Sequence, residues 1–153
     1  GDKVVMDDYW SKGQGAPSKD TFLGGKDDVL VIGGAMADGA TTLRFRRPLD
    51  TGDSLFDNVI RMGQPTNIIY AWLSGPHAVA FHGDSNFNSV QVMLTETGGD
   101  SSGSSNNTSS GSSDTCAFSN PLGEFQLSWE FTPRGTIKMQ FTLKGSGWVA
   151  IGF

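Results

Sequence analysis

Few residues of this chain have side chains that could carry out catalysis or bind a metal ion. His77 and His82 are five positions apart, so on one strand they would face opposite ways and form a poor pair of ligands for one metal. Cys116 is the single cysteine. It could be a small buried side chain, a spare thiol or, in a secreted protein, one half of a disulfide whose partner lies elsewhere. The sequence has no Ser-His-Asp or Cys-His arrangement and no phosphate-binding loop, so we predict no catalytic residue and no enzymatic activity.

Three aspartates follow one another closely after the stretch "RRPL". Asp50, Asp53 and Asp57 could line a Ca²⁺ site, but their spacing does not match an EF-hand loop and favours a solvated acidic turn. The triplet that Asp50 opens, "DTG", also occurs in aspartic proteases, whose chemistry needs two carboxylates sharing one proton at the ends of buried strands. Here the context is charged, which favours a turn. We therefore predict no metal site.

The stretch "TLRFRRP" carries three arginines. Arg44 and Arg46 fall on one face of the expected strand, and Arg47 follows at its end. Such a face could bind an anionic group, such as a sugar acid or a heme propionate, through charge-assisted hydrogen bonds. We favour the alternative, a solvated face paired with nearby aspartates.

Four aromatic residues lie in expected strands and could form a platform for stacking a sugar ring. They are Tyr9, Trp10, Tyr70 and Trp72. Aromatic residues in strands more often belong to the core.

The composition excludes several classes of partner. The chain has 153 residues, enough for one domain, with 37% hydrophobic residues and 21 glycines. A net charge of −5 argues against nucleic-acid binding, which needs a basic face, and against an anionic membrane surface. No apolar run approaches the length of a bilayer span, and the first residues lack the organisation of a signal peptide. We expect no nucleic-acid partner and no membrane insertion.

The chain divides into three parts by composition. Residues 1–94 contain short β-branched or aromatic runs separated by turn-like stretches, and "SLFDNVIRMG" could hold one helical turn. Residues 95–122 are rich in Ser, Gly and Thr, so we expect a flexible linker or long loop there. Residues 123–153 alternate apolar and polar side chains in "FQLSWEF" and "TIKMQFTL" and end in "GWVAIGF". This pattern predicts a three-stranded meander with one apolar face, which three short strands cannot cover alone.

Many short strands with regular turns indicate an all-β sandwich or barrel. The C-terminal "FQLSWEF", "TIKMQFTL" and "GWVAIGF" resemble the opening of a DOMON domain, whose members begin with a strand like "f-x-L-x-W" and continue to "G-W-v-a-i-G-f". The N-terminal "KVVMDDYWS", "TTLRFRRPLDTGD" and "NIIYAWL" resemble the later part of the same domain. The resemblance implies an immunoglobulin-like antiparallel β-sandwich whose segments here stand in offset or permuted order.

Three arrangements would explain this order. The chain could be one period of a tandem array, a permuted domain in which 123–153 folds back on its own strands, or a unit whose last strands complete the sandwich of a neighbouring copy. Chain ends normally lie at the surface, which favours the first and third arrangements over the second. We expect the apolar face of 123–153 to pack between subunits. Its packing residues would be Phe125, Leu127, Trp129, Phe131, Trp148 and Ile151.

The resemblance also implies ligands, because many DOMON domains hold a b-type heme between a Met and a His, and others bind sugars. His82 best matches the family's histidine, with His77 as its competitor, but no Met of this chain occupies the family's Met position. A surface histidine is therefore the favoured interpretation of His82. We expect no cofactor, with heme b as the alternative.

The Ser/Thr-rich segment contains two overlapping acceptor patterns for N-glycans, at Asn106 and Asn107. Its Ser and Thr content also suits O-glycans. We therefore predict a secreted, non-enzymatic glycoprotein module, the repeat unit of a tandem array or filament, whose partners are other copies of itself. The alternative is a heme-based electron-transfer module or a sugar-binding module.

Overall fold

The computed structural model describes residues 5–13, 15–75, 81–96, 116–119, 123–145 and 147–153. Within them the chain forms ten strands and one short helix. In chain order these are β1 (Tyr9–Trp10), β2 (Ser18–Lys19), α1 (Asp20–Leu23), β3 (Leu30–Ala37), β4 (Ala40–Pro48), β5 (Pro65–Ser74), β6 (Phe87–Met93), β7 (Cys116–Ser119), β8 (Phe125–Thr132), β9 (Thr136–Lys144) and β10 (Gly147–Gly152).

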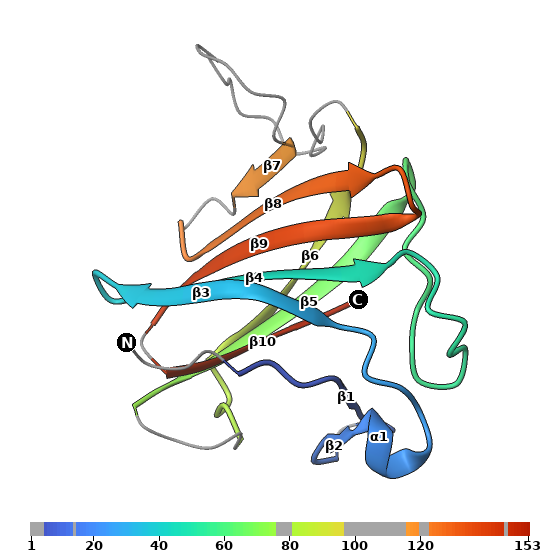
Figure 1. Cartoon of the computed structure of the whole chain (residues 1–153). Coiled ribbons are helices and arrows are strands. Elements are labelled where there is room, and N and C mark those ends of the chain that lie inside the picture. Colours follow the sequence, from blue (N-terminus) through green and yellow to red (C-terminus); the bar gives the residue numbers. More distant parts are fainter. Residues whose placement is uncertain (1–4, 14, 76–80, 97–115, 120–122, 146) are drawn as a thin grey trace.

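Two antiparallel sheets pack face to face, which confirms the predicted all-β sandwich (Figure 1). The larger sheet has the order β3-β4-β9-β8-β7, and the smaller has the order β10-β5-β6. β1 and β2 form a separate short hairpin. No helix among the described residues is long and apolar enough to cross a bilayer.

The core lies between the two sheets and follows the period of two in the sequence. The larger sheet contributes alternate residues of β8 and β9, and the smaller sheet contributes the inward face of β5 and β6. The aromatic rings of Tyr70 and Phe125 stack across the interface with centroids 4.2 Å apart. Burial of such large apolar side chains is the main force that holds the two sheets together. The buried core comprises Leu43, Phe45, Ile60, Ile68, Tyr70, Val92, Leu94, Phe125, Leu127, Trp129, Ile137, Met139, Phe141 and Leu143.

The expectation that a second copy covers the apolar face of 123–153 is wrong in this structure. β9 pairs with β4 along nine residues, and β10 pairs with β5 along six. Phe125, Leu127 and Trp129 are at most 1% exposed within the single chain. The physical reason is that β5 and β6 of the same chain present their own apolar face, which strands returning from the linker can cover. The other three residues of the predicted interface, Phe131, Trp148 and Ile151, are partly buried in the same chain.

Some local predictions also need correction. β10 does not extend the β8–β9 hairpin into a three-stranded meander, because the chain crosses after Gly145 and joins the other sheet. The end of the expected linker forms β7, which pairs with β8. The stretch "SLFDNVIRMG" holds turns without a helix, and the single helical turn is α1, which begins at Asp20. The turn between β3 and β4 consists of Asp38 and Gly39, both with positive φ.

Candidate functional site

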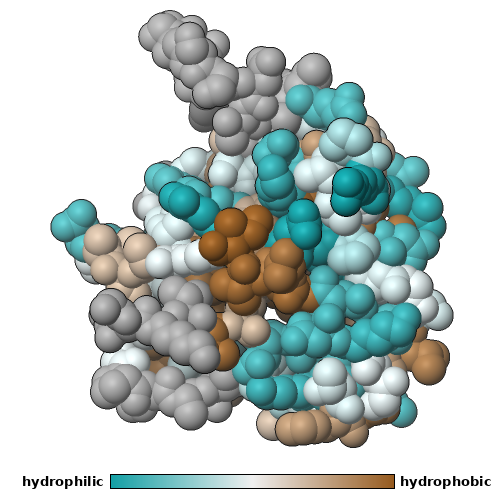
Figure 2. All heavy atoms as spheres, in the orientation of Figure 1, coloured by the Kyte–Doolittle hydropathy of each residue, from teal (hydrophilic) through white to brown (hydrophobic). Residues whose placement is uncertain are grey.

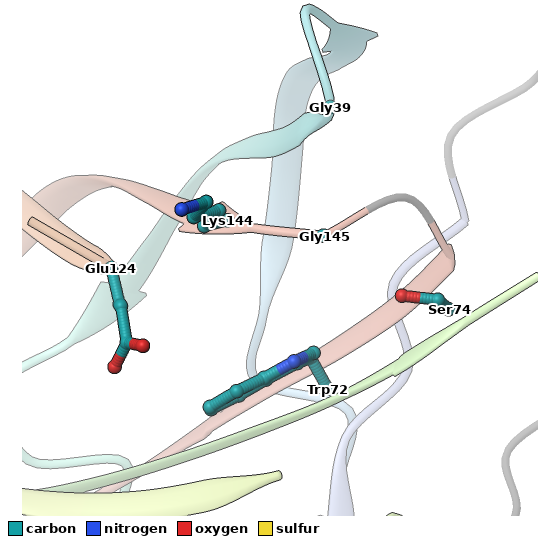
Figure 3. Close-up of a pocket in the computed structure, with 6 residues that line it drawn as sticks. All are labelled: Gly39, Trp72, Ser74, Glu124, Lys144 and Gly145. Carbon is teal, nitrogen blue, oxygen red and sulfur yellow. The ribbon is translucent and has the colours of Figure 1, made fainter.

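A hollow of about 410 Å³ opens at one end of the sandwich, between the two sheets. It lies where the β3–β4 turn, the β9–β10 turn and the C-terminal end of β5 meet. Figure 3 shows the residues that line it: Gly39, Trp72, Ser74, Glu124, Lys144 and Gly145.

Trp72 forms the aromatic wall of the hollow. It lies two residues after Tyr70 on β5, so both side chains face the interior of the sandwich. The Tyr70 ring stacks on the Trp72 indole, with ring centroids 6.3 Å apart and an angle of 18° between the ring planes. It also stacks with Phe125 of the opposite sheet. The backbone N–H of Trp72 donates to the carbonyl of Asn86 at 3.0 Å. This support fixes the indole while leaving part of it accessible from the hollow.

Two residues of opposite charge, Glu124 and Lys144, also line the hollow. The backbone N–H of Lys144 donates to the carbonyl of Glu124 at 2.8 Å, which brings the two residues together at the start of β8 and the end of β9. Neither side chain forms an ion pair with another described residue. Their donor and acceptor atoms are therefore available to a ligand.

Hydrogen bonds connect the two turns that frame the hollow. The backbone N–H of Gly145 donates to the carbonyl of Gly39 at 2.7 Å, and the Thr41 hydroxyl donates to the carbonyl of Gly145 at 2.8 Å. A Cβ at Gly145 would lie 3.1 Å from Cδ1 of Trp72. A glycine at this position thus lets the turn pass close to the edge of the indole.

The hollow has the chemistry of a sugar site. A tryptophan face stacks on the apolar face of a pyranose ring, and charged or hydroxyl side chains beside it bind the ring hydroxyls. None of the six lining residues offers an imidazole nitrogen or a thioether sulfur, the axial ligands of a b-type heme. The hollow therefore does not fit a heme.

His82 follows the same end of β5 but is not among the residues that line the hollow. Its ring lies between Phe81 and Phe87, with centroids 5.1 and 4.9 Å away. Its Nδ1 is 2.7 Å from the carbonyl oxygen of Gly83, the arrangement in which Nδ1 is protonated and donates. His82 is partly buried.

The structure separates the four aromatic residues of the predicted platform. Tyr70 is in the core and Trp72 lines the hollow, whereas Trp10 packs edge to face on Phe56 at 5.5 Å, away from the hollow. Tyr9 belongs to the same short hairpin as Trp10. Only Trp72 of this set is therefore a candidate ligand-binding residue.

The predicted acidic turn and arginine face lie at the other end of β4. Asp50 is exposed, but the Asp57 side chain is only 8% exposed and pairs with Arg47 at 3.4 Å. The solvated interpretation is therefore wrong for Arg47 and Asp57, since Arg47 shares the inward parity of Leu43 and Phe45. Arg44 and Arg46 are exposed, as predicted. Arg44 instead donates to the side-chain oxygen of Gln140 at 2.6 Å on the outer face.

Three predicted residues lie outside the described part of the chain. These are His77 and the two glycan acceptors, Asn106 and Asn107. Sequence reasoning missed Glu124 and Lys144, because nothing in the local pattern connects the residue before one strand with the last residue of the next.

A protein-family comparison supports the resemblance. The DOMON domain model matches residues 1–73, which include β1 to β4 and β5 through Leu73. The predicted resemblance to this family is thus confirmed over that segment, which carries Trp72. No curated protein and no solved structure matches the chain.

Proposed function

We propose that this chain is a non-enzymatic, extracellular DOMON module that binds carbohydrate in the hollow beside Trp72. The observation that carries the proposal is the half-buried indole, held by the Tyr70 stack, in a hollow that Glu124 and Lys144 also line. The resemblance to DOMON domains over residues 1–73 agrees with this proposal, because some members of that family bind sugars and others bind heme.

Each lining residue has a distinct role in this proposal. The indole of Trp72 stacks on the C–H face of one sugar ring and excludes water from it. Glu124 accepts hydrogen bonds from ring hydroxyls, while Lys144 and the Ser74 hydroxyl donate to ring and hydroxyl oxygens. The volume of about 410 Å³ and its open shape suit one or two sugar units at the end of a longer glycan.

The test is a glycan-array screen followed by calorimetry on the best ligand. We expect Trp72→Ala to weaken binding at least tenfold, the loss of one well-placed aromatic contact. Trp10→Ala is the matched control, because Trp10 is also half-buried but lies away from the hollow. Equal effects of the two variants, or no binding to any glycan by folded protein, would contradict the proposal.

A b-type cytochrome is the second candidate, and one observation favours it. Because Nδ1 of His82 donates to the Gly83 carbonyl, the lone pair on Nε2 is free, and Nε2 is the atom that would bind a metal ion. Hemin titration distinguishes the two candidates. A Soret band that is lost in His82→Ala supports a heme, and colourless protein that binds no hemin rules it out.

Glycosylation also remains a prediction of this proposal. N-glycans at Asn106 or Asn107 would give a mass loss on enzymatic deglycosylation of protein from a secretory host. For an array or filament, copies would have to associate through another surface or exchange strands, because β8, β9 and β10 are paired within one chain. The edge strand β3 exposes Leu30, Ile32 and Met36, and Figure 2 shows an apolar patch on this side of the molecule.

A further inference from the structure

A cluster of carboxylates lies at the end of the sandwich opposite Trp72. Asp8 precedes β1, Asp20 begins α1, and Asp57 lies in the loop between β4 and β5. One carboxylate oxygen from each of the three lies within 4.8 Å of the other two. Residues from three separate segments thus converge on one point.

Asp20 is the centre of this cluster and has no protein partner for its charge. It is 1% exposed, and neither carboxylate oxygen has a hydrogen-bond partner among the described residues. Oδ2 of Asp57 and Oδ2 of Asp28 are likewise buried without a partner. A buried, ionised carboxylate without a partner is strongly destabilising in a folded protein, so a bound cation is the simplest explanation of the unpartnered oxygens of Asp20, Asp28 and Asp57.

The charges that face the cluster do not balance it. Arg47 pairs with Oδ1 of Asp57 at 3.4 Å and leaves the other oxygen of that carboxylate free. Asp53 and Asp28 add negative charge, and Lys26 is a more distant positive group whose backbone N–H donates to Asp53 at 2.9 Å. The carboxylates of Asp8, Asp20 and Asp57 against the single guanidinium of Arg47 leave two negative charges even before Asp28 and Asp53 are counted.

The protonation behaviour agrees with this excess of negative charge. Burial, followed by the charges of Asp57 and Asp53, raises the pKa of Asp20 to about 6. Burial, followed by Asp57 and Asp20, raises the pKa of Asp8 to about 6 as well. At neutral pH both carboxylates are therefore mostly ionised and repel each other.

We propose that Asp8, Asp20 and Asp57 bind one Ca²⁺ ion, with Asp28 at its margin. The donors are all oxygens, which suit a hard divalent cation, and none is the imidazole or thiolate that zinc or copper prefers. Both oxygens of Asp20 are free, so it can bind in a bidentate manner, and water or backbone carbonyls complete the six to eight ligands that Ca²⁺ takes. The ion joins the segment before β1, α1 and the β4–β5 loop, and it replaces our prediction of no metal.

The experiment measures Ca²⁺ binding and thermal unfolding of the full chain with EDTA or with added Ca²⁺. At a Ca²⁺ concentration about a hundred times Kd, we expect the melting temperature to rise by about 5–10 °C. Asp20→Asn keeps the shape of the side chain and removes its charge, so Ca²⁺ affinity should fall at least tenfold. In EDTA the same variant should melt no lower than the wild type, because it relieves repulsion. Asp38→Asn is the control, since Asp38 is exposed in the β3–β4 turn and its left-handed φ of 52° suits asparagine equally well.

Asp8→Asn provides a second variant in case Asp20→Asn does not fold, because Asp8 is only partly buried. It too should weaken Ca²⁺ binding while leaving the EDTA melt unchanged or higher. The proposal is overturned if calorimetry detects no Ca²⁺ binding to the wild type, or if Asp20→Asn or Asp8→Asn binds Ca²⁺ as tightly as the wild type does. Binding of Zn²⁺ in preference to Ca²⁺ would also overturn it.

Discussion

At the scale of single residues, the buried aspartates make stability depend on pH. Because the pKa of Asp20 is about 6 in the folded state and its ordinary value is 3.8, the native state holds more protons between these values. Stability from this group therefore falls as pH rises from about 4 to about 6, and it is lowest at neutral pH. Without Ca²⁺, we compare the melting temperatures of the wild type and of Asp20→Asn. We expect the wild-type value to fall relative to that of the variant as pH rises from about 4 to about 6. A difference that stays constant from pH 4 to pH 7 would contradict the raised pKa.

The alternation of residues along β4 predicts the burial of Arg47 better than its arginine-rich context does. Leu43 and Phe45 lie on the face of β4 opposite to Arg44 and Arg46, and Arg47 continues their alternation, so its burial follows from the period of two. The run of three arginines instead favoured a solvated face. Asp57, the ion-pair partner of Arg47, could not be predicted in the same way, because the two residues are brought together only in the tertiary structure.

At the scale of elements, the crossing from β9 to β10 depends on Gly147. A Cβ at this position would overlap the carbonyl oxygen of Leu73 and lie 3.0 Å from the backbone of Gly75. We therefore expect Gly147→Ala to destabilise the fold by about 1–3 kcal/mol in denaturant unfolding, because β10 must shift away from β5. Gly33→Ala in β3 is the control, since nothing lies within 4 Å of its added Cβ and its φ is not positive. Equal stability of the two variants would show that β10 is not held at this point.

The same elements show what a sequence pattern can and cannot predict. The alternation in "FQLSWEF" and "TIKMQFTL" correctly predicted which side chains of β8 and β9 are buried, because burial on one face directly produces that period. It did not predict the partners of these strands, since pairing of β9 with β4 joins residues about a hundred positions apart. The hollow was missed for this reason, because Trp72, Glu124 and Lys144 come from three segments that only the finished sandwich brings together.

At the scale of the whole molecule, the two sheets are complete only when residues 123–153 are present. β9 lies at the centre of the larger sheet, and β8 and β9 supply half of the buried core residues. A chain that ends at residue 122 would leave β4 and β5 with exposed apolar faces. Residues 1–94 are therefore not a domain that we expect to fold without the C-terminal strands.

The full chain, in contrast, should fold as a monomer. We expect sedimentation velocity at micromolar concentration to give the mass of a single copy, and thermal unfolding to be one cooperative transition whose midpoint does not change with protein concentration. The physical reason is that β9 pairs with β4, and β10 with β5, within one chain. The free-energy cost of this pairing is the entropy of loop closure, and that entropy cost grows slowly with loop length. If the strands were exchanged between copies, the protein would form dimers or longer assemblies, and its midpoint would rise with concentration. Truncation at residue 122 is the comparison: it should give an unfolded or aggregated chain, and a soluble, cooperatively folding fragment would show that the C-terminal strands are dispensable.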